Sequence, residues 1–519
     1  MKRLAIVLAA AAIGLLAGCG PSGTPFHIIA GSEQKSLEPL ILDFCKQQHT
    51  ECRIDYKGSL DIGLMLDAEA APEVDAIWPA SSLWVEMYDS RRRVKALKSI
   101  YTTPVILGVR MDKAKDLGWV GRSVRMTDVL SAVKAHKLSF LMTSATQSNS
   151  GAAAYLSMLA STLGDGSRLD PSALQDAAAQ AMVKTLLQGV ARSSGSSGWL
   201  KDLYLDTAKA GQPYEAMWNY EAVIKEANDV LRSRGGSLLY AIYPAEGSTY
   251  ADAPLGYVEH GQGQANRSFF DKLQAFLLSA KAQQQIASSG RRTAPGMASP
   301  PKSEADWNFD PSRTVPSIVL PEPAIISKSL TLYQEVLRRP SLTALCLDFS
   351  GSMQGKGEAQ LKAAMRTLLN PSEASRSLIQ WSRADHIIVI PFDATVRTVL
   401  EGDGDATSQA RLMASVETET AGGGTDMYAC ASAAFKAMQP YLNKGYLPAL
   451  VLMTDGRSER ENDFAQVWRT EGHQIPVFGV TFGDADKTQL NQAADLTRAR
   501  VFDGGKNLTE AFRSARGYN

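Results

Sequence analysis

The chain has 519 residues, of which 54 are Lys or Arg and 54 are Asp or Glu, so its formal charge is zero. This length predicts two to four domains, since a domain usually holds about 100–200 residues. Hydrophobic residues make up 45% and charged residues 21%, which is typical of a globular protein and excludes disorder. The balanced charge argues against nucleic-acid binding, because a phosphate-binding surface needs a basic excess.

Residues 1–18 have the pattern of a bacterial lipoprotein signal peptide. Lys2 and Arg3 precede an apolar run from Leu4 to Leu16, and Leu16-Ala17-Gly18-Cys19 matches a lipobox with Cys19 as the lipidated residue. Acyl chains such as palmitate on Cys19 would anchor the protein to the membrane, since two or more acyl chains give stable anchoring and a single one does not. No aspartate follows Cys19 to favour retention in the inner membrane. If the host is Gram-negative, we therefore expect the protein to be anchored in the outer membrane, facing the periplasm. A plain secretory peptide is the alternative.

The N-terminal half alternates short apolar strands with amphipathic helices, which predicts βα units and mainly parallel sheets. After a tether at residues 19–26, this half is expected to span residues 27–292. The expected strands are His27–Ala30, Cys52–Tyr56, Val74–Trp78 and Pro104–Val109, and the expected helices are Leu37–Gln47, Met126–Ala135 and Gly151–Leu163. A proline-rich linker follows at residues 293–324, because prolines at this density cannot continue helices or central strands.

A second α/β pattern is expected over residues 325–519. Its predicted strands are Leu342–Phe349, His386–Phe392, Ala449–Thr454 and Val477–Phe482, and its predicted helices are Glu358–Leu369, Ser408–Val416, Met427–Leu442, Glu461–Thr470, Lys487–Leu496 and Thr509–Ala515. Six helices around a mostly parallel sheet predict a doubly wound, Rossmann-like domain. The fold class is therefore α/β throughout.

Four cysteines follow Cys19, in a compartment that allows disulfides. Cys45 and Cys52 lie between an expected helix and an expected strand, and a local disulfide between them is predicted. Cys346 and Cys430 fit either a second bridge or two buried, small apolar side chains. The chain has no C-x-x-C pair, which argues against redox catalysis and a thiolate zinc site.

The strongest sequence signal is a set of oxygen-bearing side chains at expected strand ends in the C-terminal half. Asp348-Phe349-Ser350-Gly351-Ser352 lies at the end of one strand, Gly422–Asp426 (GGGTD) opens a helix, and Asp455 follows another strand. In a doubly wound sheet, ligands collect at the carboxyl ends of the strands, so these side chains are expected to share a crevice. An all-oxygen site of this kind suits a hard divalent cation.

These motifs resemble the von Willebrand factor A (vWA) domain and its metal-ion-dependent adhesion site, the MIDAS. The resemblance implies a Mg²⁺ or Mn²⁺ site made of Asp348, Ser350, Ser352, Thr425 and Asp455. It implies that the two serines and Thr425 bind the metal directly or nearly so, and that the two aspartates act chiefly through bound water. The open coordination position would take an acidic side chain of a protein partner.

Small polar side chains also follow the expected strands of the N-terminal half. Gly31-Ser32-Glu33 and Gly58-Ser59 follow the first two strands, Ser148–Gly151 opens a helix, and Trp218–Glu221 precedes a further segment. Hydroxyls and free N–H groups at helix starts suit an anion or a small polar ligand. Each serine alone fits a helix cap as well as a ligand contact.

Residues from His27 to about Arg292, including the stretch Phe270–Gly290, resemble type 2 periplasmic solute-binding proteins of ABC importers. The resemblance implies two lobes around a cleft, with chain crossings near Tyr101–Leu107 and Ser237–Pro244. The residues it places against a ligand are Ser32, Ser59, Ser150 and Tyr220. Glu33 and Glu221 adjoin these loops, and either carboxylate would repel an oxyanion if it pointed inward.

No motif assembles a nucleophile, a base and an oxyanion hole, so we do not expect an enzyme. We expect a membrane-anchored extracytoplasmic lipoprotein whose vWA domain binds an acidic group on a protein partner through Mg²⁺. The solute-binding-like half would sense a ligand or present the vWA domain. The alternative is a lipoprotein that delivers a small polar or oxyanion solute to an ABC importer, with the vWA domain regulatory.

Overall fold

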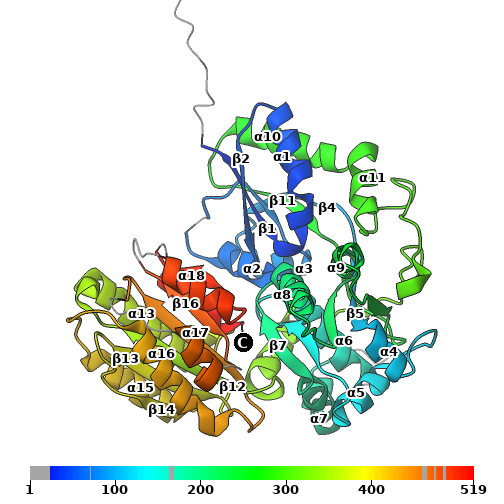
Figure 1. Cartoon of the computed structure of the whole chain (residues 1–519). Helices are drawn as coiled ribbons and strands as arrows, with labels where there is room; N and C mark the ends of the chain where they lie inside the picture. The colour runs from blue at the N-terminus through cyan, green and yellow to red at the C-terminus, as the bar shows by residue number, and fades with distance from the viewer. Residues whose placement is uncertain are drawn as a thin grey trace, which may run out of the picture.

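The structure is a computed structural model, and it describes residues 24–70, 72–162, 169–458, 464–472, 475–482, 487–505 and 507–518. The expected signal peptide, Cys19 and most of the tether lie outside these residues. Three β-sheets organise the described chain, two in the N-terminal half and one in the C-terminal half (Figure 1). We call the bodies around the first two sheets lobe 1 (residues 26–100 and 253–288) and lobe 2 (residues 102–251).

Lobe 1 has a five-stranded sheet in the order β2-β1-β3-β11-β4. Strands β1, β2 and β3 are parallel, and β11 runs antiparallel to β3 and β4. The strands are β1 (Phe26–Gly31), β2 (Cys52–Lys57), β3 (Ala76–Trp78), β4 (Val94–Ser99) and β11 (Pro254–Val258), and the helices are α1 (Glu38–Gln47), α2 (Ser59–Asp67), α3 (Leu83–Tyr88), α10 (Gln264–Leu277) and α11 (Ala280–Ser288).

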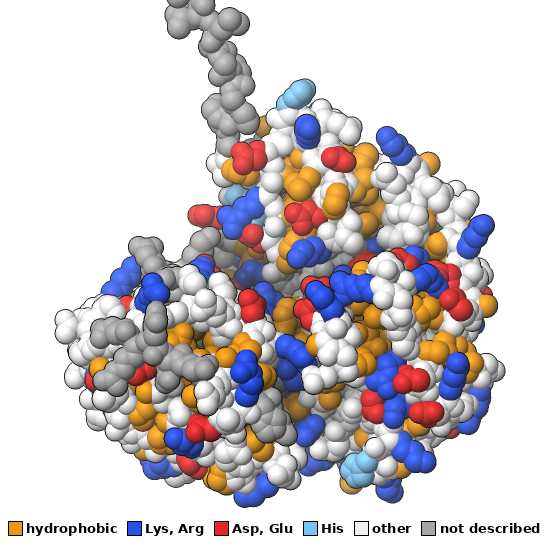
Figure 2. All heavy atoms as spheres, viewed as in Figure 1, with side chains coloured by type: hydrophobic (Ala, Val, Ile, Leu, Met, Phe, Trp, Pro, Cys, Tyr) orange, Lys and Arg blue, Asp and Glu red, His pale blue; other side chains and the backbone are white. Residues whose placement is uncertain are grey.

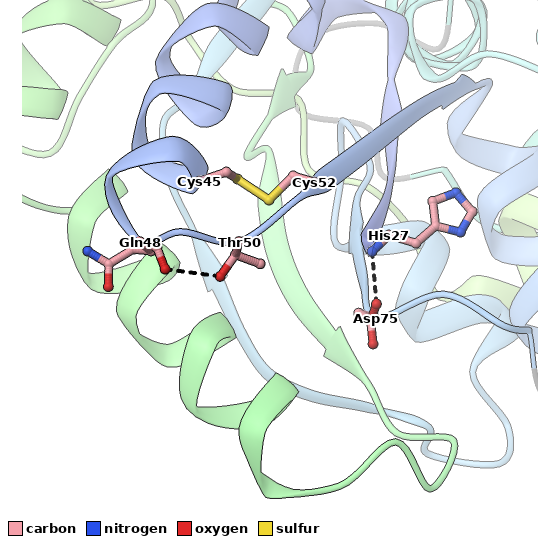
Figure 3. The surroundings of a disulfide bond; sticks show 6 residues. All are labelled: His27, Cys45, Gln48, Thr50, Cys52 and Asp75. Atoms are coloured by element: carbon pink, nitrogen blue, oxygen red, sulfur yellow. Dashed lines mark hydrogen bonds between the residues drawn. A yellow bond between two sulfur atoms is a disulfide. The ribbon is translucent and has the colours of Figure 1, made fainter. Parts of the chain in front are cut away.

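A disulfide between Cys45 and Cys52 links α1 to β2 in lobe 1 (Figure 3). In the turn that it closes, the Thr50 hydroxyl donates to the Gln48 carbonyl oxygen at 3.3 Å. Nearby, the His27 backbone N–H donates to the Asp75 carboxylate at 2.8 Å. The expected local bridge is thus present at the edge of the sheet, where it holds the first βα unit together.

Lobe 2 has a sheet in the order β10-β5-β8-β6-β7, with β9 paired to β5. Its strands are β5 (Thr103–Arg110), β6 (Phe140–Thr143), β7 (Val190–Ser194), β8 (Ala216–Tyr220), β9 (Leu239–Ile242) and β10 (Tyr250–Ala251), and its helices are α4 (Met111–Asp116), α5 (Met126–Lys134), α6 (Asn149–Ser161), α7 (Ala177–Leu187), α8 (Ser197–Lys209) and α9 (Glu221–Ser233).

The chain crosses between the lobes at one of the two expected places and, for the second crossing, at a different one. The first crossing lies between β4 and β5, inside the expected Tyr101–Leu107 region. The second expected crossing, near Ser237–Pro244, is wrong: β9 pairs with β5 inside lobe 2, and the chain leaves only between β10 and β11. Strands β9 and β11 are both short, apolar and close together in sequence, so the sequence does not show which of them belongs to lobe 1.

The C-terminal domain has a six-stranded sheet in the order β14-β13-β12-β15-β16-β17, in which only the β13–β14 pair is antiparallel. Its strands are β12 (Ser341–Asp348), β13 (His386–Phe392), β14 (Leu400–Asp403), β15 (Leu447–Thr454), β16 (Val477–Thr481) and β17 (Val501–Asp503), and its helices are α13 (Lys356–Leu369), α14 (Pro371–Arg376), α15 (Ala406–Thr418), α16 (Met427–Met438), α17 (Phe464–Val467), α18 (Lys487–Leu496) and α19 (Leu508–Arg516).

Two hydrophobic clusters cover the two faces of this sheet. Leu345 and Leu347 of β12 pack in the cluster with α13, α15 and α19, while Ala344 and Cys346 pack in the cluster with α16 and α18. Alternate side chains of a strand point to opposite faces, so β12 is apolar on both sides. The expected doubly wound α/β fold is confirmed, and a disulfide joins Cys346 in β12 to Cys430 in α16.

The segment between the two halves is folded onto lobe 2. Trp307 and Phe309 stack with their ring centroids 4.7 Å apart and are buried in a lobe 2 cluster. Helix α12 (Pro323–Leu332), which continues as a π-helical turn to Leu337, packs into the main lobe 2 cluster. The Tyr155 hydroxyl of α6 donates to the Ser329 carbonyl oxygen at 2.8 Å. The connection is therefore part of the packed structure.

Candidate functional site

Two backbone hydrogen bonds bring the loops of the candidate metal site together. The Gly422 N–H donates to the Phe349 carbonyl oxygen at 2.8 Å, and the Gly351 N–H donates to the Gly423 carbonyl oxygen at 2.9 Å. A Cβ atom on Gly351 would lie 3.2 Å from that same carbonyl oxygen, and Gly423 has a φ of +86°. The glycines therefore permit a close approach that side chains would obstruct.

The five predicted metal-binding side chains converge at the carboxyl ends of β12 and β15. The Ser350 and Ser352 hydroxyls share a hydrogen bond of 3.1 Å, and the Ser352 hydroxyl lies 2.7 Å from Asp455 Oδ1, to which it donates. Asp348 Oδ1 accepts from the Ser350 N–H at 2.8 Å. The Thr425 and Ser352 hydroxyls lie 3.6 and 3.8 Å from the position of a Cβ atom on Gly456.

This site has a buried floor and an open side. Asp348 is fully buried, and Thr454 donates its hydroxyl proton to Asp348 Oδ2 at 2.5 Å. Burial raises the pKa of Asp348, while hydrogen bonds from Thr454 and Ser350 oppose that rise. Ser352 is exposed and Asp455 is partly exposed, so solvent reaches the site from their side.

The donor set consists of two carboxylates and three hydroxyls, all of them hard oxygen ligands. Within the described ranges, no group of three or more His, Cys, Asp or Glu residues is placed to hold a metal ion. A cluster rich in carboxylates or one with soft ligands is thus absent from that part of the chain. Oxygen donors with few charges fit a small, hard divalent cation that keeps some of its water.

Arg397, which no sequence motif indicates, supports both loops of the candidate site. Its Nη2 donates to the Phe349 carbonyl oxygen at 3.1 Å and to the Gly422 carbonyl oxygen at 3.3 Å. It also pairs with Asp393 at 3.0 Å and with Glu419 at 2.8 Å. Arg397 follows β13 and carries no local motif, so only the fold reveals this role.

The four predicted cleft residues are engaged within the protein. Ser59 accepts from the Ala80 N–H at 2.9 Å inside lobe 1, and Ser150 shares a 2.8 Å hydrogen bond with Thr143 inside lobe 2. Tyr220 accepts from the Asn149 amide at 3.1 Å. Ser32 instead forms a hydrogen bond across the cleft, since it accepts from the Gly198 N–H of lobe 2 at 3.0 Å.

The lobes contact each other directly in this closed arrangement. The buried Glu33 carboxylate of lobe 1 accepts from the Ser197 hydroxyl of lobe 2 at 3.1 Å. Burial raises the pKa of Glu33 to about 7. Glu221 instead forms a pair with Arg292 at 2.7 Å and accepts from the Tyr243 hydroxyl. Of the two acids expected to oppose an oxyanion, Glu33 is the one that bridges the lobes.

Two family models match the chain. A model described as bacterial extracellular solute-binding protein matches residues 27–292, which is half of the chain. This chain belongs to the family of bacterial extracellular solute-binding proteins. A second model, von Willebrand factor type A domain, matches residues 344–510. The protein thus combines a solute-binding domain with a C-terminal VWA domain, as the sequence resemblances predicted.

Solved structures match each domain at low identity. The periplasmic binding protein AfuA from Actinobacillus pleuropneumoniae is 14% identical over 53% of this chain and 86% of its own, with a TM-score of 0.40. The ferric binding protein from Campylobacter jejuni is 13% identical over 59% and 98%, with a TM-score of 0.42. A von Willebrand factor type A protein from Catenulispora acidiphila is 19% identical over 35% and 42%, with a TM-score of 0.29.

This chain therefore spans less than half of the length of that VWA protein. No curated protein matches the chain significantly. The solute-binding family is described as extracellular, which indicates a protein of the periplasm or cell envelope. Among the described residues, no helix has both the length and the apolar character needed to cross a membrane.

The contact between the VWA domain and the solute-binding domain was not foreseen either. Arg513 of α19 pairs with Asp61 of lobe 1, and its carbonyl oxygen accepts from the Gln147 amide of lobe 2 at 2.5 Å. The Tyr518 ring lies 4.9 Å from the Trp199 ring of lobe 2, measured between centroids. These residues lie up to 457 positions apart in the chain (61 to 518) and share no motif, so nothing local in the sequence indicated the contact.

Proposed function

We propose that this protein is a lipid-anchored envelope protein that captures a protein partner through a Mg²⁺-dependent site in its VWA domain. The observation that carries the proposal is the convergence of Ser350, Ser352, Asp348 and Asp455 through hydrogen bonds at one edge of the sheet, with Thr425 beside them. The anchor is proposed from the lipobox at Cys19.

In this proposal the hydroxyls of Ser350, Ser352 and Thr425 hold the ion, and Asp348 and Asp455 orient the water bound to it. Mg²⁺ (or Mn²⁺) would offer an open coordination position to a carboxylate of the partner. The site has only two carboxylates, and in this proposal neither contacts the ion directly. The positive charge of the ion would therefore be only partly neutralised, which favours an acidic ligand.

The position of the site supports capture of a large partner. Strand β12 begins at Ser341, which contacts the buried Arg516 near the solute-binding domain, and ends at Asp348. Eight residues of strand place those ends about 23 Å apart. Ser352, close to the end of β12 that carries Asp348, is exposed to solvent. On the face drawn in Figure 2, acidic and basic side chains are interspersed.

The solute-binding domain is proposed to sense a ligand or to present the VWA domain. Delivery of a small polar or oxyanion solute to an ABC importer is the second candidate function, and family membership is the observation that favours it. The bridge from Glu33 to Ser197 disfavours an oxyanion in the closed cleft, because the carboxylate lies between the lobes.

Metal binding is tested first, on the soluble chain from Gly20. Mg²⁺ at about 100 times its dissociation constant should stabilise the VWA domain by about 2.7 kcal/mol, seen as a rise in Tm. Asp348→Asn should abolish this rise. Asp405→Asn, which replaces the partly exposed N-cap residue of α15 far from the site, is the matched control and should keep this rise.

An equal response of Asp348→Asn and the wild-type chain to Mg²⁺ would contradict the proposed site. So would a wild-type chain whose Tm is the same in Mg²⁺, in Mn²⁺ and in chelator.

A further inference from the structure

The last helix of the VWA domain, α19, contacts both lobes of the solute-binding domain at once. On lobe 1, Lys57 at the end of β2 pairs with Glu510, and Asp61 in the first turn of α2 pairs with Arg513. On lobe 2, the Gln147 amide donates to the Arg513 carbonyl oxygen at 2.5 Å. Because these loops belong to different lobes, α19 ties the lobes to each other.

The residues after α19 fill the junction further. A Cβ atom on Gly517 would lie 1.9 Å from Gln147 Oε1, and one on Gly195 would lie 2.9 Å from the Tyr518 ring. The chain ends at the junction of the two halves, where Figure 1 marks its C-terminus. Glycine at positions 195 and 517 thus permits a fit with no room for side chains.

The loops that hold α19 also start the helices of the cleft. Gly58 precedes Ser59 at the start of α2, and a Cβ atom on it would lie 2.2 Å from the Gln147 carbonyl oxygen. Gln147 precedes α6, which carries Ser150, and Gly195 precedes α8. If lobe 1 moved away from lobe 2, α19 could not keep its contacts with Lys57 and Asp61 of lobe 1 and its contact with Gln147 of lobe 2 at the same time.

The Arg513 contacts at this surface are buried, whereas the Lys57–Glu510 pair is partly exposed. The Arg513 and Asp61 side chains are 9% and 14% exposed, and Gln147 is 2% exposed. Breaking a buried ion pair costs more than breaking a surface pair, since the remaining charge stays desolvated. The surface is thus able to hold the lobes together.

We propose that the mouth of the cleft is a docking surface for α19 of the same chain, so that the VWA domain holds the solute-binding domain closed. The cleft opens only when α19 detaches from one lobe. A solute in the cleft and the fully docked VWA domain are then alternatives, which links the two domains energetically. This inference needs neither a metal nor a protein partner, so it stands apart from the function proposed above.

The test measures distances between spin labels on the soluble chain from Gly20. Leu42→Cys (lobe 1), Val120→Cys (lobe 2) and Val399→Cys (VWA domain) are exposed sites, and the four cysteines at 45, 52, 346 and 430 are in disulfides. Arg513→Asp should lengthen the mean distance between the labels on the two lobes and broaden its distribution, because it places a second acid next to Asp61. Combining it with Asp61→Arg exchanges the charges and should restore the wild-type distance.

Arg366→Asp is the matched control, since it makes the same charge change at an exposed residue of α13 that pairs with Glu417 of α15. It should leave the distances between the lobes unchanged. The proposal is overturned if Arg513→Asp leaves the lobe-to-lobe distance unchanged, whether or not the VWA domain moves relative to lobe 1. It is also overturned if the charge exchange fails to restore that distance.

Discussion

At the scale of single residues, Glu33 shows how closure of the cleft changes a titrating group. Its carboxylate is buried between the lobes, and its Oε1 has no hydrogen-bond partner among the described residues. Burial raises its pKa from 4.5 to about 7, more than the hydrogen bond from Ser197 and the charge of Arg291 lower it. The closed protein therefore holds a proton that the unfolded chain releases.

This shift predicts a loss of stability with rising pH. Below pH 4.5 the carboxyl is protonated in both states, and between pH 4.5 and 7 the unfolded chain ionises first, so the folded state loses about 3 kcal/mol. Glu33→Gln removes the group, so its Tm should rise relative to wild type between pH 5 and pH 8 in calorimetry. The exposed Glu51→Gln is the control, and a Tm difference that does not change with pH would contradict the prediction.

The sequence could single out the residues of the proposed metal site because each lies within a short motif beside a strand end. Asp348, Ser350 and Ser352 share one turn, and Thr425 follows three glycines. Arg397 and Thr454 could not be predicted in the same way. Their contacts depend on how separate strands lie next to each other, and neither side chain is unusual for its position.

At the scale of elements, Asp385 joins four segments at the edge of the VWA sheet that lies opposite the proposed metal site. This fully buried carboxylate accepts from the Ser341 N–H at 2.7 Å and the Ser382 N–H at 2.9 Å. It also pairs with Arg338, after α12, and with Arg516 of α19. These partners lower the pKa of Asp385, while burial lowers that of Arg516 to about 10.

Asp385→Asn should therefore destabilise the protein strongly. It leaves two buried arginines without a counter-charge, and breaking a buried pair in this way costs roughly 3–5 kcal/mol. The loss should appear in urea unfolding followed by circular dichroism. Glu417→Gln, which breaks an exposed pair with Arg366, should cause little change. Equal midpoints for the two variants would show that Asp385 is not a structural junction.

Most elements were predictable because hydrophobic periodicity marks strands and helices buried on one or two faces. Strands β12 and β13 were expected within one residue of their bounds. Helix α12 was missed because it lies among prolines and its apolar side chains pack on lobe 2. The fold determines which elements far apart in the sequence pack against each other, and such contacts leave no local pattern in the sequence.

At the scale of the whole molecule, the arrangement separates two surfaces. The interdomain contact is made by α19, which follows the edge strand β17, whereas the proposed metal site lies at the carboxyl ends of the central strands β12 and β15. Capture of a partner and closure of the cleft could then occur on one molecule without blocking each other. Both families were predictable from sequence motifs, whereas the placement of the domains relative to each other was not.

The measurement that tests the central claim most directly is a pull-down from host envelope extract with the soluble chain from Gly20. It is made in Mg²⁺, in chelator, and with Asp348→Asn in Mg²⁺, with Asp405→Asn as the control. We predict one partner that is captured by the wild type and by Asp405→Asn in Mg²⁺, and that is lost in chelator and with Asp348→Asn. Equal capture under all four conditions would contradict metal-dependent adhesion.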